Sequence, residues 1–261
     1  MMLANYHTHT PRCNHAVGKE RRYVERALEG GFKELGFSDH TPYFFGEPGY
    51  YSSFRMHPDE LEDYVKTLLA LREEYAGRIQ IYIGLEAEYY PKYFLRLLEY
   101  MRQFPLDYLI LGQHLLYNEE EGVASPRPTA DEKLLDQYRG QTLEALETGL
   151  FSYFAHPDLF HFIGDEKVYD RHVRAICRRA NELHLPLEYN LQGQRDRKHY
   201  PDPRFWRIAA EEGSEVVIGS DAHAPLMTWD PQSTAEAETF LQTLGIAPVQ
   251  FVRLRPIQES K

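Results

Sequence analysis

Short apolar segments alternate with longer amphipathic segments along almost the whole chain. The apolar segments are predicted to be β-strands, and they lie near 3–8, 34–38, 79–85, 107–112, 152–156, 186–190, 215–219 and 249–253. The segments between them carry apolar residues at helical spacing. Because strands that alternate with helices form a parallel sheet covered by helices, the pattern predicts an α/β fold.

Three amphipathic segments are long enough to be assigned as packing helices, at 58–76, 130–148 and 167–184. Pro58 stands at the start of the first of them, and Gly77 follows its last residue. Proline suits the first turn of a helix and glycine suits the residue after its end, so both residues agree with the predicted limits.

Two long segments, 41–57 and 117–129, do not fit the alternation. Connections of this length without secondary structure often serve as lids over a functional site. The aromatic residues Tyr43, Phe44 and Phe45 either stack on a flat ligand or pack against a neighbouring loop. We expect packing.

Length and composition indicate one globular domain over 1–261. The chain is 43% hydrophobic and 26% charged, and no change in composition marks a linker. No apolar run approaches the length of a bilayer span and the first residues do not resemble a signal peptide, so the predicted location is cytoplasmic, without a membrane partner. Cys13 and Cys177 are too few for a disulfide framework.

The formal net charge of −11 argues against a broad basic surface. Nonspecific binding to nucleic acid depends on such a surface, so nucleic acid is not an expected partner. An anionic substrate requires positive charge concentrated at one place. Bound metal ions would supply that charge.

Histidines and acidic residues concentrate where the predicted strands end. They are His7, His9, His15, His40, Glu86, His114, His156, Asp221 and His223. In a parallel barrel the carboxyl ends of all strands share one face, so these side chains are expected to meet there. His7 and His9 are two residues apart in an extended segment and therefore point to the same side.

This set of donors predicts a metal centre. Imidazoles combined with carboxylates suit zinc, iron or manganese, and the two oxygens of Glu86 could bridge adjacent ions. A single histidine at a strand end is more often a hydrogen-bonded polar residue, but packing alone gives no reason for seven of the twelve histidines to share one face. The remaining histidines are interpreted as surface or capping residues, and they are His57, His161, His172, His184 and His199.

Six motifs carry a family resemblance. In chain order they are HTHTPRCNHA, FSDHTPY, GLEAEYYP, DYLILGQH, FAHPDL and GSDAH. They resemble the polymerase and histidinol phosphatase (PHP) family, and more narrowly its stand-alone histidinol-phosphate phosphatase branch, over essentially the whole chain. The resemblance implies a distorted, TIM-like (β/α)7 barrel, so the eighth predicted strand, 249–253, is assigned outside the barrel.

The resemblance also implies two or three divalent metals, which would be zinc, iron or manganese. The first metal is expected at His7, His9, Glu86 and Asp221. The second is expected to share Glu86 and to add His114 and His156. The third is expected at His15, His40 and His223.

The implied activity is hydrolysis of a small phosphate monoester, with L-histidinol phosphate as the expected substrate. A hydroxide that bridges two metals is expected to attack phosphorus, because metal coordination lowers the pKa of water towards about 7. Glu86 and Asp221 are expected to hold these metals. Asp39 is expected to orient His40 or a bound water.

Substrate binding is predicted in the segment EYNLQGQR. Its residues Asn190, Gly193 and Arg195 resemble the family's Asn-x-x-Gly-x-Arg pattern. Arginine suits bidentate contacts to a phosphoryl group, so Arg195 is the first candidate, and an arginine exposed to solvent is the alternative. Leu191 and Gln192 depart from the small polar residues usual in the family, so the substrate is the least determined part of the prediction.

Other functions fit the same residues. A phosphodiesterase or exonuclease of the family would use the same metals, and it ranks second because the chain is acidic and shows no polymerase module. A phosphatase acting on another metabolite would differ only in its substrate. A noncatalytic metal-binding protein is least favoured, because structural metal sites are usually closed shells of four ligands.

Overall fold

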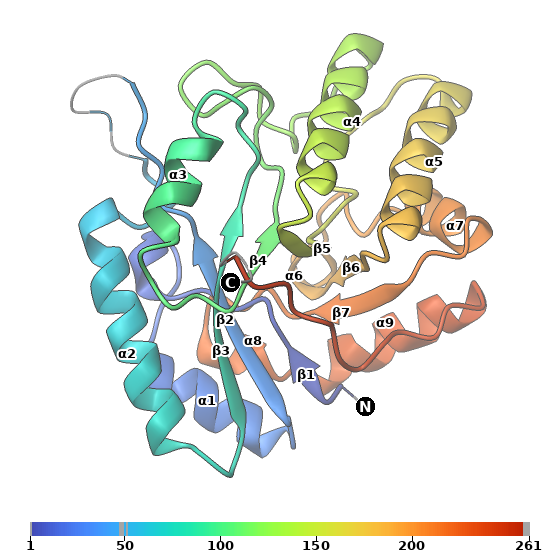
Figure 1. The fold of residues 1–261 in the computed structure, drawn as a ribbon. Helices are drawn as coiled ribbons and strands as arrows, with labels where there is room; N and C mark the ends of the chain where they lie inside the picture. The colour runs from blue at the N-terminus through green and yellow to red at the C-terminus, as the bar shows by residue number, and fades with distance from the viewer. Residues whose placement is uncertain (1, 47–49, 51, 258–261) are drawn as a thin grey trace.

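The computed structural model describes residues 2–46, 50 and 52–257 (Figure 1). Seven parallel strands form one sheet whose order follows the chain. They are β1 (Ala4–Asn5), β2 (Glu34–His40), β3 (Gln80–Ala87), β4 (Tyr108–Leu111), β5 (Phe151–Phe154), β6 (Leu187–Asn190) and β7 (Val216–Gly219). A helix follows every strand, so the predicted α/β alternation is confirmed.

The helices surround the strands (Figure 1). The α-helices are α1 (Glu20–Glu29), α2 (Leu61–Glu74), α3 (Phe94–Met101), α4 (Glu132–Glu147), α5 (Glu166–Glu182), α6 (Leu191–Arg195), α7 (Pro203–Glu211), α8 (Pro225–Thr228) and α9 (Pro231–Thr243). Two 3-10 helices, η1 (Pro11–Cys13) and η2 (Pro58–Glu60), complete the set in the described part of the chain. The three predicted packing helices correspond to η2 with α2, to α4 and to α5. Asp131 and Asp165 begin α4 and α5 because their carboxylates accept hydrogen bonds from free N–H groups of the first turn.

Contacts between the ends of the first and seventh strands nearly close the barrel. Thr8 and Ala222 form an isolated parallel bridge. The N–H of His9 donates to the carbonyl of Ala222 at 3.0 Å, and the N–H of Ala222 donates to the carbonyl of His7 at 3.2 Å. The predicted distorted seven-stranded barrel is therefore confirmed, and its closing contacts lie at the carboxyl end of the strands.

The prediction of a β-strand at 249–253 is wrong. Within this segment the structure has one bridge residue, Val249, which pairs with Val217 of β7. Val252 instead packs among the side chains inside the barrel, where its N–H lies 3.4 Å from the hydroxyl of Tyr6. The apolar residues of this segment are therefore buried against the end of the barrel at which the strands begin, and they do not pair as a strand.

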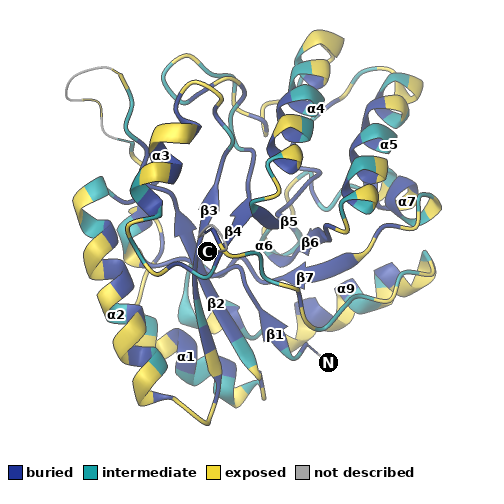
Figure 2. Ribbon diagram, in the orientation of Figure 1, coloured by how far each residue is buried: buried dark blue, intermediate teal, exposed yellow. Residues whose placement is uncertain are grey.

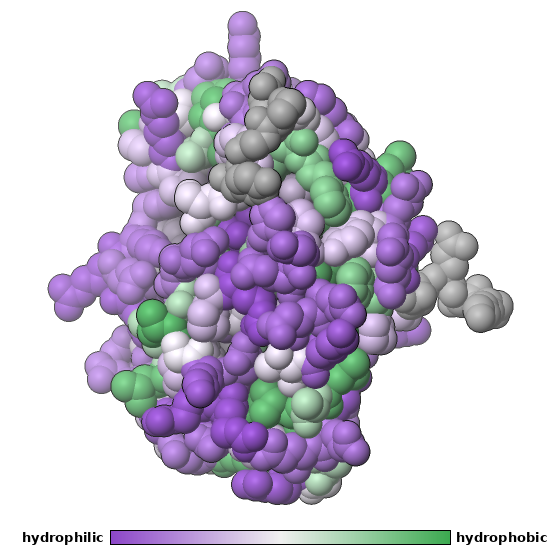
Figure 3. All heavy atoms as spheres, turned by 90° about the vertical axis from the view of Figure 1, so that its left-hand side faces the viewer, coloured by the Kyte–Doolittle hydropathy of each residue, from purple (hydrophilic) through white to green (hydrophobic). Residues whose placement is uncertain are grey.

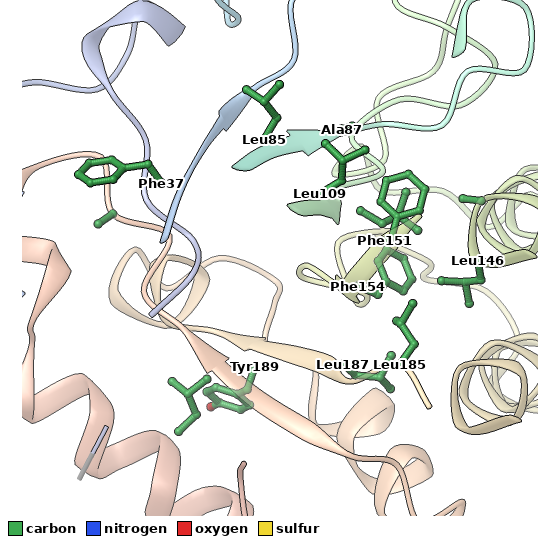
Figure 4. Close-up of a cluster of buried hydrophobic side chains, with 14 of the residues drawn as sticks. Phe37, Leu85, Ala87, Leu109, Leu146, Phe151, Phe154, Leu185, Leu187 and Tyr189 are labelled. Carbon is green, nitrogen blue, oxygen red and sulfur yellow. The ribbon is translucent and has the colours of Figure 1, made fainter. Parts of the chain in front are cut away.

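Strand alternation divides the apolar residues between two layers. In β4, Tyr108 and Ile110 point into the barrel, whereas Leu109 and Leu111 face the helices. The outer layer is the larger one, and Figure 4 shows part of it, where side chains of β4 and β5 lie beside Leu146 of α4. The strands are buried and the outer faces of the helices are exposed (Figure 2), so the core lies inside and directly around the barrel.

The loop after β2 packs Tyr43, Phe44 and Phe45 beside the site rather than over it. Tyr43 is buried, and its ring lies 4.9 Å from the ring of Tyr90 and 5.4 Å from that of Phe45. Phe44 contacts an aromatic ring of α3 at 5.0 Å. The packing alternative is confirmed for these three residues, while 47–49 and 51 of the predicted loop lie outside the described residues.

The surface over α2 and α3 is mostly hydrophilic, with hydrophobic side chains scattered across it (Figure 3). Among the residues that the structure describes, no helix combines the length and the apolar character needed to cross a bilayer. The cytoplasmic location stays a prediction.

Gly84 of β3 makes room for a ring inside the barrel. A methyl group at Gly84 would lie 2.4 Å from Cε1 of Tyr108, whose hydroxyl donates to the carbonyl of Tyr6 at 2.7 Å. Because this ring is fixed and buried, we expect Gly84→Ala to lower the free energy of unfolding by about 1–3 kcal/mol in urea denaturation. The control Gly140→Ala in α4, where an added Cβ meets nothing within 4 Å, should not be destabilising. Equal stability of the two variants would contradict this account.

Candidate metal centre

All nine predicted metal ligands lie at the carboxyl end of the barrel. Their nitrogen and oxygen atoms form overlapping groups in which the atoms lie within 4.8 Å of one another. Three of these groups are His7 with His9 and Glu86, His7 with His156 and Asp221, and His15 with His40 and His223. The residues chosen from the sequence are therefore neighbours in space, and their role as ligands stays a prediction.

The carboxylate of Glu86 lies at the middle of this arrangement. Its Oε2 is 3.4 Å from Nε2 of His7, 3.5 Å from Nε2 of His9 and 3.1 Å from Nδ1 of His40. These three histidines come from β2 and from the segment after β1. Adjacent strands of the barrel therefore direct their ring nitrogens at one oxygen atom.

The second oxygen of Glu86 faces two further histidines. Its Oε1 is 2.8 Å from Nε2 of His156 and 3.5 Å from Nε2 of His114. Each oxygen of one carboxylate thus has its own group of nitrogen donors. A carboxylate in this position can bridge two cations, as in metal sites that hold two ions about 3.5–4 Å apart.

Asp221 reaches the same place from the end of β7. Its Oδ1 is 3.2 Å from Nε2 of His9, 3.6 Å from Nε2 of His7 and 3.3 Å from Nδ1 of His223. Asp221 has a φ of 46° and His156 a φ of 31°. A positive φ is uncommon in residues other than glycine, and residues held in such conformations cluster at functional sites.

His15 and His223 form the outer part of the centre. Their Nε2 atoms are 3.0 Å apart, and the rings of His15 and His40 are 5.4 Å apart. Two Nε2 lone pairs at this distance repel each other unless a proton or a cation lies between them. A cation shared with His40 would satisfy all three rings.

Several buried atoms of the centre have no hydrogen-bond partner among the described residues. They are Nε2 of His7, Nε2 of His9, Nδ1 of His40, Oε2 of Glu86 and Oδ1 of Asp221. Each unpaired buried polar atom costs about 1–3 kcal/mol, so their convergence indicates a missing partner. Divalent cations such as zinc, iron or manganese accept lone pairs from imidazole and carboxylate alike, so these residues fit such a cation.

The pKa values of the histidines in the centre shift in both directions. Burial alone would lower the pKa of His7 and of His9, but the surrounding carboxylates, Asp221 foremost, raise both well above the usual value. Burial by itself raises the pKa of Glu86, but the nearby imidazoles, His114 and His40 foremost, outweigh burial and hold this pKa well below its usual range. Burial lowers the pKa of His40 well below its usual value and that of His223 to about 3. At neutral pH these two rings are therefore uncharged and keep a lone pair.

Glu188 is a residue of the centre that the sequence reasoning missed. Its Oε1 lies 2.8 Å from Nδ1 of His7, and its Oε2 accepts the N–H of His156 at 3.1 Å. A carboxylate can only accept, so Nδ1 of His7 carries the proton and Nε2 presents its lone pair to the centre. Glu188 precedes Asn190 by two residues in β6. Residues two apart in a strand point to the same side, so this spacing could have identified Glu188 from the sequence.

Glu88 was also missed, although it follows Glu86 by two residues. Its Oε1 lies 2.8 Å from Nδ1 of His114, and its two oxygens accept from the buried guanidinium of Arg55 at 3.0 and 3.2 Å. Glu88 therefore fixes the ring of His114 with Nε2 towards Glu86. Arg55 offsets the charge that this carboxylate would otherwise leave buried.

Asp39 lies against His9 rather than against the ring of His40. Its Oδ1 is 3.3 Å from Nδ1 of His9 and accepts the backbone N–H of His40 at 2.9 Å. Its Oδ2 accepts the N–H of Thr10 at 3.1 Å. The expected role in orienting the ring of His40 does not match these contacts, because the carboxylate lies against the ring of His9. The alternative role, orienting a bound water, stays a prediction.

The predicted substrate-binding residues lie beside the cavity of the centre rather than in its lining. Arg195 donates to the carbonyl of Ser220 at 2.6 Å. Asn190 begins α6 by accepting the N–H of Gly193 at 3.0 Å, and it donates to Asp221 at 3.1 Å. A Cβ on Gly193 would lie 2.4 Å from the ring of Tyr200. Their role in substrate binding stays a prediction, and these contacts are structural.

A cavity of about 440 Å³ opens onto the centre. Beyond the candidate ligands, its walls are formed by Phe54, Pro126, Leu159, Gln192, Lys198, His199 and Tyr200. The long segments 41–57 and 117–129 contribute Phe54 and Pro126, so each supplies one wall residue. The cavity therefore combines a polar floor with a partly apolar rim.

Two of the histidines interpreted as surface or capping residues are placed otherwise. His199 lines the cavity, and its Nε2 donates to the carbonyl of Leu159 at 2.8 Å. His172 is buried between α4 and α5, 3.8 Å from carboxylate oxygens of both Glu132 and Asp136. The sequence does not show that His199 leaves the surface, because that depends on the connection after α6, which turns back towards the barrel. His57 does cap η2.

A family model and individual relatives indicate the same protein family. The model of the PHP domain family matches residues 5–191. The chain is 33% identical over 233 residues to a probable histidinol-phosphatase of Deinococcus radiodurans, covering 85% of this chain and 87% of that protein. It is 32% identical over 256 residues to the histidinol-phosphatase of Bacillus subtilis, covering 85% of this chain and 94% of that protein.

The fold also matches a solved structure. The histidinol phosphate phosphatase of Lactococcus lactis, crystallised with zinc, L-histidinol and phosphate, matches with a TM-score of 0.73 and 18% sequence identity. The match covers 100% of this chain and 99% of that one. It supports the assignment of the barrel fold over the full length of the chain.

We predict that Glu86→Gln loses most of the metal bound by the parent protein, because the amide keeps the shape of the side chain but not its charge or its second acceptor oxygen. Elemental analysis after gel filtration measures the metal, and circular dichroism checks that the variant is folded. Glu144→Gln, on the exposed side of α4, serves as the control. A folded Glu86→Gln protein with a full complement of metal would contradict the bridging role.

Glu188→Gln should weaken metal binding less than Glu86→Gln does. Losing the carboxylate that orients His7 is expected to lower metal affinity about 10–100-fold. Competition with a chelator gives the affinity of parent and variant. An affinity equal to that of the parent would show that the contact between Glu188 and His7 does not support the centre.

Proposed function

The chain belongs to the PHP domain family, and on that premise we propose that it is a metal-dependent phosphatase that hydrolyses L-histidinol phosphate to L-histidinol and inorganic phosphate. The histidinol-phosphatases among its relatives support this substrate. The observation that carries the proposal is the position of Glu86, whose two oxygens face separate groups of histidine nitrogens.

The proposed cofactors are two or three divalent cations, which would be zinc, iron or manganese. The first would be held by His7, His9, Glu86 and Asp221, the second by Glu86, His114 and His156, and the third by His15, His40 and His223. When bound, such cations offset the negative charge of the phosphoryl group and activate water for attack on phosphorus. Each proposed set combines donors from different strands.

The protein's own residues prepare the site for this reaction. Glu188 and Glu88 hold the protons on the outward nitrogens of His7 and His114, so the inward nitrogens keep their lone pairs. Asp39 fixes the ring of His9. Because these supporting carboxylates are buried in fixed hydrogen bonds, little reorganisation is needed when a substrate binds.

The cavity suits a small monoester rather than a polymer. A volume of about 440 Å³ lies in the range of about 300–1,000 Å³ usual for small-molecule sites. Its apolar residues Phe54, Pro126 and Leu159 can contact the leaving group while the phosphate faces the histidines. The net charge of −11 disfavours a nucleic-acid substrate.

We expect the manganese- or zinc-loaded protein to hydrolyse L-histidinol phosphate and p-nitrophenyl phosphate, and Glu86→Gln to reduce both rates to background. Released phosphate and p-nitrophenol are the measured products. Bis-p-nitrophenyl phosphate tests the phosphodiesterase alternative under the same conditions. Activity on the diester alone would overturn the proposal, and activity on p-nitrophenyl phosphate without L-histidinol phosphate would exclude the proposed substrate.

A further inference from the structure

Lys198 is the one lysine or arginine among the described residues that line the cavity. It belongs to the connection between α6 and α7. An anionic phosphate that enters this cavity therefore meets one lysine side chain in the wall, besides any bound cations. Arg195, the candidate favoured by sequence, is turned to the carbonyl of Ser220 instead.

The backbone around Lys198 is held in place by its neighbours. The N–H of Lys198 donates to the carbonyl of Gly193 at 2.9 Å. Tyr200 is buried against Gly193, and His199 donates to the carbonyl of Leu159 at 2.8 Å. The lysine is therefore presented from a fixed segment, although its own side chain is exposed.

The ammonium group is connected to the candidate metal centre through one side chain. Nζ of Lys198 donates to Oε1 of Gln192 at 3.1 Å, and Nε2 of Gln192 lies 3.0 Å from Nδ1 of His223. The amide of Gln192 thus holds the ammonium group of Lys198 on the side of the cavity next to His223. The nearby carboxylate of Asp196, at 3.3 Å, forms an exposed ion pair, which a bound phosphate can replace at little cost.

We propose that Lys198 is a substrate-binding residue that contacts the phosphate oxygens, with Gln192 positioning its ammonium group. The inference rests on the proposed phosphatase function and adds a cationic contact from the wall of the cavity, while the role of Arg195 stays a prediction. Lysine suits the task because its compact charge can follow the phosphate from the bound substrate to the released product.

The test measures inorganic phosphate binding and turnover in the metal-loaded protein. For Lys198→Ala we expect the dissociation constant of inorganic phosphate, measured by calorimetry, to rise about tenfold, as for loss of one charge-assisted hydrogen bond. The KM for p-nitrophenyl phosphate should rise similarly while kcat changes less, and the metal content should be unchanged. Lys198→Arg should restore most of the phosphate affinity.

Two matched variants separate this role from a structural one. Lys167→Ala removes an exposed lysine of α5 that does not line the cavity, so it should leave phosphate affinity unchanged. Asp196→Asn breaks the ion pair with Lys198 and should maintain or increase the affinity. If Asp196→Asn reproduces the loss seen for Lys198→Ala, the lysine acts only by holding the connection, and the proposal is overturned.

Phosphate binding also separates this inference from the proposed function. A parent protein that binds phosphate through Lys198 but does not turn over L-histidinol phosphate would retain the binding site and exclude that substrate. An unchanged phosphate affinity in Lys198→Ala, or no phosphate binding in the metal-loaded parent, would overturn the assignment of Lys198.

Discussion

The structure depends on the burial of one carboxylate, that of Glu86, among imidazoles from three sides of the barrel. A buried negative charge is tolerated only when positive or polar partners surround it. Here ring nitrogens of His7, His40 and His156 lie 2.8–3.4 Å from its two oxygens. Where such a nitrogen keeps its lone pair, a cation between it and the carboxylate is the partner that both atoms require. Because the charge of Glu86 needs partners on all sides, the ends of strands that are distant in sequence must lie at the same level in the barrel. The same arrangement brings together the donor atoms of a metal centre.

A second set of carboxylates supports the first. Glu188, Glu88 and Asp39 each face the outward nitrogen of a histidine whose other nitrogen points towards Glu86 or Asp221. The arrangement has two layers of carboxylates, with Glu86 and Asp221 in an inner shell and the three supporting acids in an outer shell. Each acid of the outer shell determines which nitrogen of its histidine carries the proton. Arg55 extends the outer shell into the long loop after β2, so a loop that looks irregular in sequence helps to balance its charge.

The sequence predicted the seven strands of the barrel and the meeting of the candidate ligands at one end of it, because both leave a periodic trace, whereas the apolar segment 249–253 was wrongly predicted to be a strand. Strand ends are visible where apolar runs stop, and His7 with His9 or Asp221 with His223 stand two apart there. The carboxylates Glu188 and Glu88 also stand two residues from Asn190 and Glu86, so strand alternation could have identified them. The residues that form the cavity wall were less accessible, because they depend on which way each connection turns. The turn after α6 takes Arg195 out of the cavity lining and brings in Lys198, and no local pattern encodes that exchange.

The seam of the barrel lies between the first strand and the residues that follow the last one, where His9 and His7 hydrogen-bond to Ala222. These hydrogen bonds join residues near opposite ends of the chain, so they require the first and the last strand of the barrel together. His7 and Asp221 therefore cannot become neighbours until the last strand of the barrel has been synthesised. During synthesis on the ribosome, the emerging polypeptide cannot complete this pocket before Asp221 has been added, and a cation held there would report that both ends of the barrel have come together.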